Sequence, residues 1–373
     1  MAAMLTARAL GRATLARQLL LRREAVDVAD GVRRVAAIQA QAPASPYIAL
    51  WNRVADLTPA AVDDAFASFA VVKATLMRVT LHAVHADDHA LFHRAMQPTL
   101  RAARLNDRRF TGQGLTARDA DALVERLPEL LATPQSNADM EEKLAHPRLW
   151  WALRHYGPVV HAPVGSTWTF GERPAYLAAP HQSSSVDPDE AAKHLVRRYL
   201  AAFGPATAAD VAQFALMPRA RAREVVGSMR EELVTREGPD GALLLDVDGA
   251  PLPDEDVPAP PRLLPMWDSV LLAYADRSRT VPPEYRPLVT RRNGDVLPTV
   301  LVDGKVAGVW RPVPDGGLEV SAFHRLTDDD WEGVAREAAG LVAFLGEREP
   351  LVYSRYGHWW RDLPAAEVRT LGA

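Results

Sequence analysis

The sequence contains no cysteine. This absence excludes disulfide bonds, thiolate zinc sites and cysteine nucleophiles, and it suits a protein of the reducing cytoplasm. No apolar run approaches the roughly 18 residues that cross a membrane, so we expect no membrane partner. The sequence also lacks a phosphate-binding glycine loop and a Gly-x-Ser-x-Gly nucleophile elbow, which leaves nucleotide-hydrolysing and serine-hydrolase activities without support.

The composition is that of an ordinary globular protein, with 48% hydrophobic and 24% charged residues among 373, enough for several domains. The net charge of −4 argues against a nucleic-acid partner, but the charges are segregated along the chain. Residues 1–110 hold 15 Lys and Arg against 9 Asp and Glu, and residues 191–230 hold 7 against 2, whereas residues 231–260 hold 1 against 9. Because local positive fields attract phosphates, we expect one basic face and an acidic back.

Residues 1–110 show helices followed by a β-ribbon. Val28, Val32 and Val35 have a helical spacing that continues to Gln39, which places this glutamine on the apolar stripe of a helix. Two more helices are predicted, one over residues 46–54 and one from residue 58 onward. A two-stranded hairpin that pairs 71–76 with 79–84 follows. Three helices and a ribbon are typical of a winged helix.

The same order of elements recurs twice. In residues 111–185 we expect helices at 116–131, 137–144 and 147–156, and a ribbon that pairs 159–161 with 167–170. In residues 186–250 we expect helices at 190–203, 208–216 and 218–229, and a ribbon that pairs 233–235 with 243–245. The last part, 251–373, starts in a linker at 248–261 and continues with a hairpin around 303–305 and a helix at 327–344. The predicted fold is therefore mainly α with β-ribbons (α+β), as three tandem winged-helix units plus a C-terminal β-rich segment.

Two glutamines stand out in this pattern. Gln39 and Gln41 lie two residues apart at the predicted end of the first helix, just before Pro43. A buried amide without partners costs roughly 1–3 kcal/mol, so a glutamine on an apolar stripe should be hydrogen-bonded or face a cavity. The two amides could tie down the turn after the helix, or they could share one small object such as a water in a functional site.

Five segments spread over nearly the whole chain carry a resemblance: Ile38-Gln39-Ala40-Gln41, Met77-Arg78-Val79-Thr80-Leu81-His82, Gly204-Pro205-Ala206-Thr207, Leu264-Pro265-Met266-Trp267-Asp268 and Val302-Asp303-Gly304-Lys305-Val306-Ala307-Gly308-Val309-Trp310. Together they resemble the bacterial AlkZ-like winged-helix DNA glycosylases of the azinomycin-resistance type. The catalytic signature of that family is Gln, an aliphatic or small residue, then Gln, and it falls on Gln39, Ala40 and Gln41. In a related branch with a broader range of cross-links, an acid replaces the second glutamine. Val79 stands where the common family pattern has glycine.

The resemblance implies a monofunctional DNA glycosylase that removes bulky N7-alkylguanine lesions and unhooks interstrand cross-links. Its implied role is self-resistance to a DNA-alkylating natural product such as azinomycin. The resemblance also implies that Gln39 and Gln41 are catalytic and that no metal or cofactor is needed. An N7-alkylated guanine is already a cation, so it can leave without a general acid. Two amide oxygens that hold a water below C1′ and face the developing positive sugar can then suffice.

The expected partner is double-stranded DNA that carries alkylated purines, bound by a monomer in a concave basic channel formed by the three units. The implied location is the bacterial cytoplasm, at the nucleoid. Phosphate contacts would supply most of the binding energy. The candidate DNA-binding residues are Arg78, Arg101, Arg104, Arg108, Arg219, Arg221 and Arg223.

Three further residues are candidates for contacts with the lesion or the catalytic pocket: His82, Trp359 and Trp360. Each has a structural alternative, since a lone histidine on a strand is often a packing residue and tandem tryptophans often seal a domain seam. The helical spacing of His85, His89 and His93 could in principle bind a metal. Without a partner carboxylate or cysteine, we predict no metal site there.

Two other functions would use the same fold without this chemistry. One is a non-catalytic winged-helix DNA-binding regulator, and the other is a protein that sequesters the alkylating agent itself. The predicted position of Gln39 on an apolar stripe favours the enzyme, because a regulator has no need of amides at that point.

Overall fold

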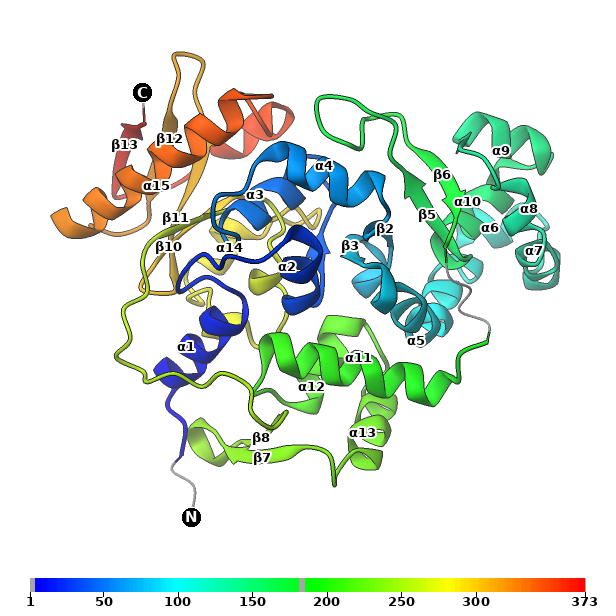
Figure 1. Cartoon of the computed structure of the whole chain (residues 1–373), viewed down its shortest axis with the longest axis horizontal. Coiled ribbons are helices and arrows are strands. Elements are labelled where there is room, and N and C mark those ends of the chain that lie inside the picture. The colour runs from blue at the N-terminus through cyan, green and yellow to red at the C-terminus, as the bar shows by residue number, and fades with distance from the viewer. Residues whose placement is uncertain (1–3, 181–184, 373) are drawn as a thin grey trace.

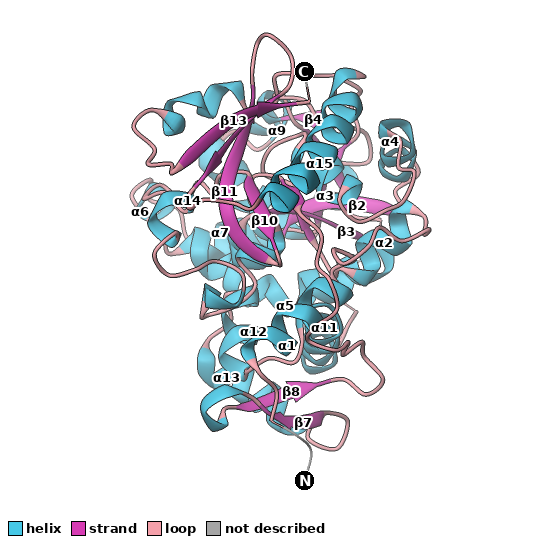
Figure 2. Ribbon diagram, turned by 90° about the vertical axis from the view of Figure 1, so that its left-hand side faces the viewer, coloured by secondary structure: helices cyan, strands magenta, loops and turns pink. Residues whose placement is uncertain are grey.

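The computed structural model describes residues 4–180 and 185–372, and it combines many helices with four small antiparallel sheets (Figures 1 and 2). This mixture of helix and strand is the predicted fold class. The described chain begins with α1 (Ala7–Arg17), whose N-terminus is capped by the side chain of Thr6. Among the described helices, none is long and apolar enough to cross a membrane.

The first part of the chain is built on a three-stranded sheet in the order β1-β3-β2. Its elements are α2 (Val28–Arg34), β1 (Ile38–Gln39), α3 (Ser45–Trp51), α4 (Pro59–Ala67), β2 (Val71–Thr75), β3 (Leu81–His85) and α5 (Ala86–Leu105). The predicted hairpin is confirmed, with a short 3-10 turn at Met77–Val79 between β2 and β3. The helix expected from residue 58 onward is α4, and it is capped by the Thr58 hydroxyl, which accepts a hydrogen bond from the Ala61 amide.

The prediction that Gln39 lies on a helix is wrong. α2 ends at Arg34, and Ala36 has a φ of 66°, a left-handed conformation that an α-helix does not tolerate. Ile38 and Gln39 are extended and pair with β3. The alanines around Gln39 show no clear hydrophobic periodicity that would distinguish helix from strand. The open edge of β3 pairs with this segment, and this tertiary contact is not visible in the local sequence.

The second part contains a three-stranded sheet in the order β4-β6-β5. Its elements are α6 (Arg108–Thr111), α7 (Ala117–Val124), α8 (Leu127–Leu130), β4 (Gln135–Ser136), α9 (Asn137–Lys143), α10 (Pro147–Tyr156), β5 (Val159–Ala162) and β6 (Ala175–Ala178). The single helix predicted over 116–131 is wrong. α7 ends at Val124 and α8 begins at Leu127, with Pro128 in the first turn of α8, where it has no amide hydrogen to continue the hydrogen-bond ladder of α7.

The predicted ribbon of the second part is half correct. β5 forms as predicted, but its partner is β6 and not residues 167–170. Thr169 is instead bound to the first part of the chain, since its amide donates to the Tyr47 hydroxyl at 3.0 Å and its side chain donates to Asp63 at 2.6 Å. The loop between β5 and β6 therefore reaches across to α3 and α4.

The third part agrees with its predicted elements. They are α11 (Pro188–Phe203), α12 (Ala208–Ala215), α13 (Arg219–Ser228), β7 (Val234–Glu237) and β8 (Leu243–Asp246), with β7 and β8 paired. Thr207 and Asp210 form a reciprocal capping box at the start of α12. Gly204 ends α11, as the sequence indicates.

The last part is a five-stranded sheet in the order β13-β12-β11-β10-β9. Its elements are β9 (Arg262–Leu264), α14 (Arg286–Val289), β10 (Thr299–Val302), β11 (Lys305–Pro312), β12 (Leu318–Ala322), α15 (Asp328–Gly346) and β13 (Glu367–Leu371). The hairpin around 303–305 and the final helix are confirmed, and residues 248–261 form neither helix nor strand, as expected of a linker.

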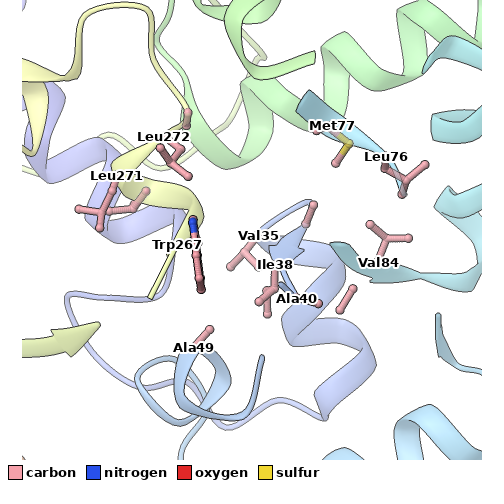
Figure 3. Packing of buried hydrophobic residues seen from close by; sticks show 14 of the residues in the cluster. Val35, Ile38, Ala40, Ala49, Leu76, Met77, Val84, Trp267, Leu271 and Leu272 are labelled. Carbon is pink, nitrogen blue, oxygen red and sulfur yellow. The ribbon is translucent and has the colours of Figure 1, made fainter. Parts of the chain in front are cut away.

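One connected hydrophobic core runs through all four parts. Ile38 and Ala40 lie in it, across from Trp267 and the segment that follows it, so β1 of the first part packs toward the last part (Figure 3). Buried ion pairs also join the parts, for example Arg53 with Asp268 at 2.9 Å. The winged-helix assignment of the three units, and the boundaries at 110/111, 185/186 and 250/251, stay predictions; residues 181–184, beside the second boundary, lie outside the described residues.

Candidate active site

Gln39 occupies a buried position on the sheet of the first part. It lies directly opposite His82 in the β1–β3 pair, and only 4% of its surface is exposed. Arg78 Nη2 donates a hydrogen bond to its side-chain oxygen at 2.9 Å. The buried amide thus has the partner that its burial demands, and this partner is a cation.

Arg78 reaches Gln39 from the turn between β2 and β3. Its φ of 55° lies in the left-handed region, and its Nη1 donates to the Phe214 carbonyl of α12 at 3.3 Å. Among the described residues, no carboxylate pairs with this guanidinium. Burial lowers the pKa of Arg78 to about 10, with a further contribution from the nearby charge of Arg277. The hairpin tip therefore places an unpaired positive charge beside Gln39.

His82 completes this cluster as a neutral base. Its Nδ1 donates to the Thr80 carbonyl at 3.0 Å, which leaves Nε2 as the acceptor for Arg78 Nη2 at 3.3 Å. Burial, followed by the charge of Arg78, lowers the pKa of His82 to about 3. His82 is fully buried, so its role is to hold Arg78 in place beside Gln39 through this hydrogen bond.

Gln41 has a different environment. It lies just beyond β1, is exposed, and its side-chain oxygen accepts only a long contact of 3.4 Å from the Leu81 amide. It lies on the walls of two adjoining clefts, one of about 710 Å³ and one of about 230 Å³. Gln41 can therefore meet a ligand from solvent, whereas Gln39 is held from inside by Arg78.

The larger cleft contains residues that the sequence did not single out. It is lined by the β5–β6 loop, by residues 41–44, and by the segment Tyr353, Ser354, Arg355 and Tyr356. Lys73 of β2 also lines it and lies 4.7 Å from the Phe170 ring centre, and burial lowers its pKa to about 8. No sequence motif pointed to these residues, because they meet only when the second and last parts fold against the first.

Trp359 and Trp360 do not line either cleft. Trp359 donates from its indole nitrogen to Asp295 at 2.8 Å and packs under Arg291, while Trp360 is buried in the core. These contacts match the structural alternative, a seam within the last part. The same 3-10 segment (Ser354–Trp360) still reaches the larger cleft through Arg355 and Tyr356.

Two of the predicted DNA-binding arginines are brought to the glutamines. Arg78 binds Gln39, and Arg104 of α5 lines the smaller cleft beside Gln41. Arg101, one turn earlier, is paired with Asp121 at 2.5 Å. Arg108 of α6 is exposed.

The remaining three arginines lie on α13. Arg219 and Arg223 are exposed, and neither pairs with a described carboxylate. Arg221 is half-buried and binds Asp189 at 2.5 Å and Glu224 at 3.1 Å. Arg219 and Arg223 thus have charges that a phosphate could meet, while Arg221 is already compensated.

The histidine stripe is used within the protein. His85 caps α5, and His93 Nε2 contacts the Tyr156 carbonyl at 3.0 Å. His89 and His93 stack with ring centres 6.0 Å apart. Within 4–180 and 185–372, no group of three His, Asp or Glu side chains has the geometry of a metal site.

The site thus consists of neutral amides, a neutral histidine and an unpaired arginine next to an open cleft. Such groups can orient a water and bind anionic DNA, and they supply no strong acid or base.

The chain is similar to known proteins in sequence and in structure. A family model described as "DNA glycosylase AlkZ-like" matches residues 32–344. A curated Streptomyces sahachiroi protein called "Interstrand DNA cross-link repair glycosylase" is 28% identical over 359 residues and covers 88% of this chain and 94% of the relative. The solved structure of Streptomyces sahachiroi DNA glycosylase AlkZ matches with a TM-score of 0.77 and 24% identity, over 94% of this chain and 99% of that one. The family match spans most of the chain, and the chain therefore belongs to the AlkZ-like DNA glycosylases.

Proposed function

We propose that this DNA glycosylase hydrolyses the N-glycosidic bond of bulky N7-alkylguanine lesions and unhooks interstrand cross-links. The observation that carries the proposal is Gln41 on the wall of an open cleft, two residues from the buried Gln39. We further propose that the protein acts as a monomer on duplex DNA at the nucleoid, in self-resistance to a DNA-alkylating natural product. The name of the Streptomyces relative supports the cross-linked substrate.

In this proposal the glutamines position the attacking water, and the positive charge of the alkylated base makes it a good leaving group. The departing base neutralises its own positive charge, so no general acid is required. The Gln41 oxygen holds the attacking water, and the dipole of the Gln39 amide stabilises the positive charge that develops on the sugar. Each such group typically contributes 10²–10³-fold, which is enough for a labile bond and too little for an unmodified nucleotide.

Arg78 has a distinct place in this scheme. Its charge opposes a cation on the sugar, and it occupies the oxygen of Gln39 at 2.9 Å. We assign it to a DNA phosphate, because a phosphate is a stronger acceptor than an amide oxygen and would draw the guanidinium away from Gln39. DNA binding would then free the Gln39 oxygen for the reaction.

The test is incubation with duplexes that carry a single N7-methylguanine, a bulky N7-guanine adduct, or an N7–N7 cross-link. Mass spectrometry should detect the released modified base, and alkali should cleave the abasic strand. DNA binding without released base would instead support the regulator. Binding of the free alkylating agent, again without released base, would support sequestration.

A further inference from the structure

The smaller cleft carries positive charge and has no role in the reaction proposed above. Its volume is about 230 Å³, and Gln41 forms part of its wall. Two arginines project to it from different helices, Arg104 from α5 and Arg154 from α10, which pack against each other (Figure 1). None of the described residues that line it is acidic.

Arg104 lacks the counter-charge that its neighbours have. Arg101 is paired with Asp121, and Arg109 with Asp107 at 2.6 Å, but no described carboxylate pairs with Arg104. Its guanidinium lies 5.2 Å from the Trp151 ring centre, and its Nε is buried without a hydrogen-bond partner. A buried donor with no partner is uncommon in folded proteins and suggests a missing acceptor.

Arg154 is held in place by neutral groups. Its Nη1 donates to the Asn137 side-chain oxygen at 2.6 Å and to the Tyr176 hydroxyl at 3.4 Å. No carboxylate in the described part of the chain pairs with it. These contacts fix the direction of the guanidinium but leave its charge uncompensated.

The cleft therefore concentrates positive charge without a protein anion. Burial keeps its two histidines neutral, since it lowers the pKa of His155 to about 3 and that of His161 well below its ordinary value. Burial lowers the pKa of Arg104, and the charges of Arg109 and Arg154 lower it further, against an opposing effect of Asp107. An anion between Arg104 and Arg154 would relieve the repulsion of their charges, and guanidinium groups bind phosphate oxygens with matched geometry.

We propose that the smaller cleft binds one backbone phosphate of the lesion-bearing DNA strand between Arg104 and Arg154, and thereby holds the adjoining sugar at Gln41. This rests on the proposed glycosylase function. The cleft suits a phosphate group, because two arginines and no carboxylate are among the described residues that line it. The covalent link between phosphate and sugar then converts a backbone contact into positioning of C1′.

The experiment combines protein variants with DNA in which single phosphates are replaced by neutral methylphosphonates. The duplex carries one N7-alkylguanine, and each phosphate near the lesion is replaced in turn. For each pair, Kd and the single-turnover rate of base release are measured. Arg154→Gln should weaken binding to all-phosphate DNA roughly tenfold, the usual effect of one charge-assisted hydrogen bond. It should also reduce the salt slope by about 0.9, the value for one phosphate contact.

At one phosphate position, methylphosphonate should weaken the wild type at least as much as Arg154→Gln weakens binding, because both arginines lose their acceptor, and it should weaken Arg154→Gln less, because only the Arg104 contact remains to be lost. Arg104→Gln should show the same reduced sensitivity at that position, because Arg154 remains, and Arg154→Lys should recover part of the loss. Arg148→Gln is the matched control, since Arg148 lies on α10, is half-buried and lines neither cleft. This control should respond to methylphosphonates as the wild type does.

Additive effects of methylphosphonate and arginine substitution at every position would overturn the phosphate site. If the wild type still releases base, the glycosylase proposal survives that result. A wild type that releases no base from any duplex would refute the proposed function. The Kd values of the protein variants with phosphate and methylphosphonate DNA would still show whether Arg104 and Arg154 bind one phosphate. Arg104→Gln serves as the second variant if loss of the Asn137 contact unfolds Arg154→Gln.

Discussion

Gln39→Ala should destabilise the protein as well as slow the reaction. Gln39 is buried and accepts the hydrogen bond of Arg78 at 2.9 Å. The substitution leaves the guanidinium with two remaining acceptors, His82 Nε2 and the Phe214 carbonyl, both at 3.3 Å. At an exposed helix end, the substitution would leave stability almost unchanged. On the buried strand β1, it should lower the free energy of unfolding.

The magnitude follows from the type of bond that is lost. Hydrogen bonds to charged groups contribute about 1.5–3 kcal/mol, and the void left by the side chain adds to the loss. We therefore expect Gln39→Ala to lower the free energy of unfolding by about 2–3 kcal/mol. Gln41→Ala should lower it by less than about 0.5 kcal/mol, because Gln41 is exposed and makes only a 3.4 Å contact.

Urea unfolding of both variants measures this difference, and a double-mutant cycle with Arg78→Met isolates the pair. The coupling between Gln39 and Arg78 should reach about 1.5 kcal/mol or more. Equal stability losses for Gln39→Ala and Gln41→Ala, or a coupling near zero, would refute the view that Arg78 holds Gln39.

Three further predictions concern the chemistry, the DNA surface and pH. Gln41→Glu should retain base release or extend it to other N7 adducts, since a carboxylate also favours a developing cation; complete loss in single-turnover assays would count against the role of Gln41. Arg219→Ala and Arg223→Ala should each flatten the salt dependence of DNA binding by about 0.9 without altering sequence preference, and Arg221→Ala should do so less because of its ion pairs. The folded state keeps His82 neutral with a pKa of about 3, so stability should fall as pH drops below about 6.5, by up to about 1.4 kcal/mol per unit for this group. His82→Asn should show a shallower loss between pH 7 and 5, and an unchanged slope would contradict the assignment.

Much of the fold could be predicted because its elements carry local signals. Thr207 with Asp210 and Thr327 with Asp330 are capping boxes that mark helix starts, and both appear in the structure. The turn at Asp303 and the stop at Gly204 are equally local. Where caps and turns agree with the hydrophobic period, sequence and structure coincide.

The errors arose where distant segments decide the local structure. Gln39 pairs with β3, whose edge is open to another strand. Thr169 lies outside the predicted ribbon, and its amide donates a hydrogen bond to the Tyr47 hydroxyl. β6 consists of Ala, Tyr, Leu and Ala, a sequence with little strand preference of its own. Tertiary pairing outweighed propensity in each case.

The candidate site was predictable only in its motif residues. The Gln-x-Gln pattern pointed to Gln39 and Gln41, but nothing local linked them to Arg154 or Lys73. These two basic residues reach the clefts beside Gln41 from α10 and β2, and they are recognised as part of one site only after folding.

The most direct test of the central claim is single-turnover excision of one N7-alkylguanine by the wild type, Gln39→Ala, Gln41→Ala and the double variant, at saturating DNA and at a temperature where all four are folded. We expect losses of roughly 10²-fold or more for each single variant. The double variant should lose far less than the product, because the two amides act on one reaction centre. Wild-type rates for both single variants would contradict the account, as would losses that disappear once the unfolded fraction is taken into account.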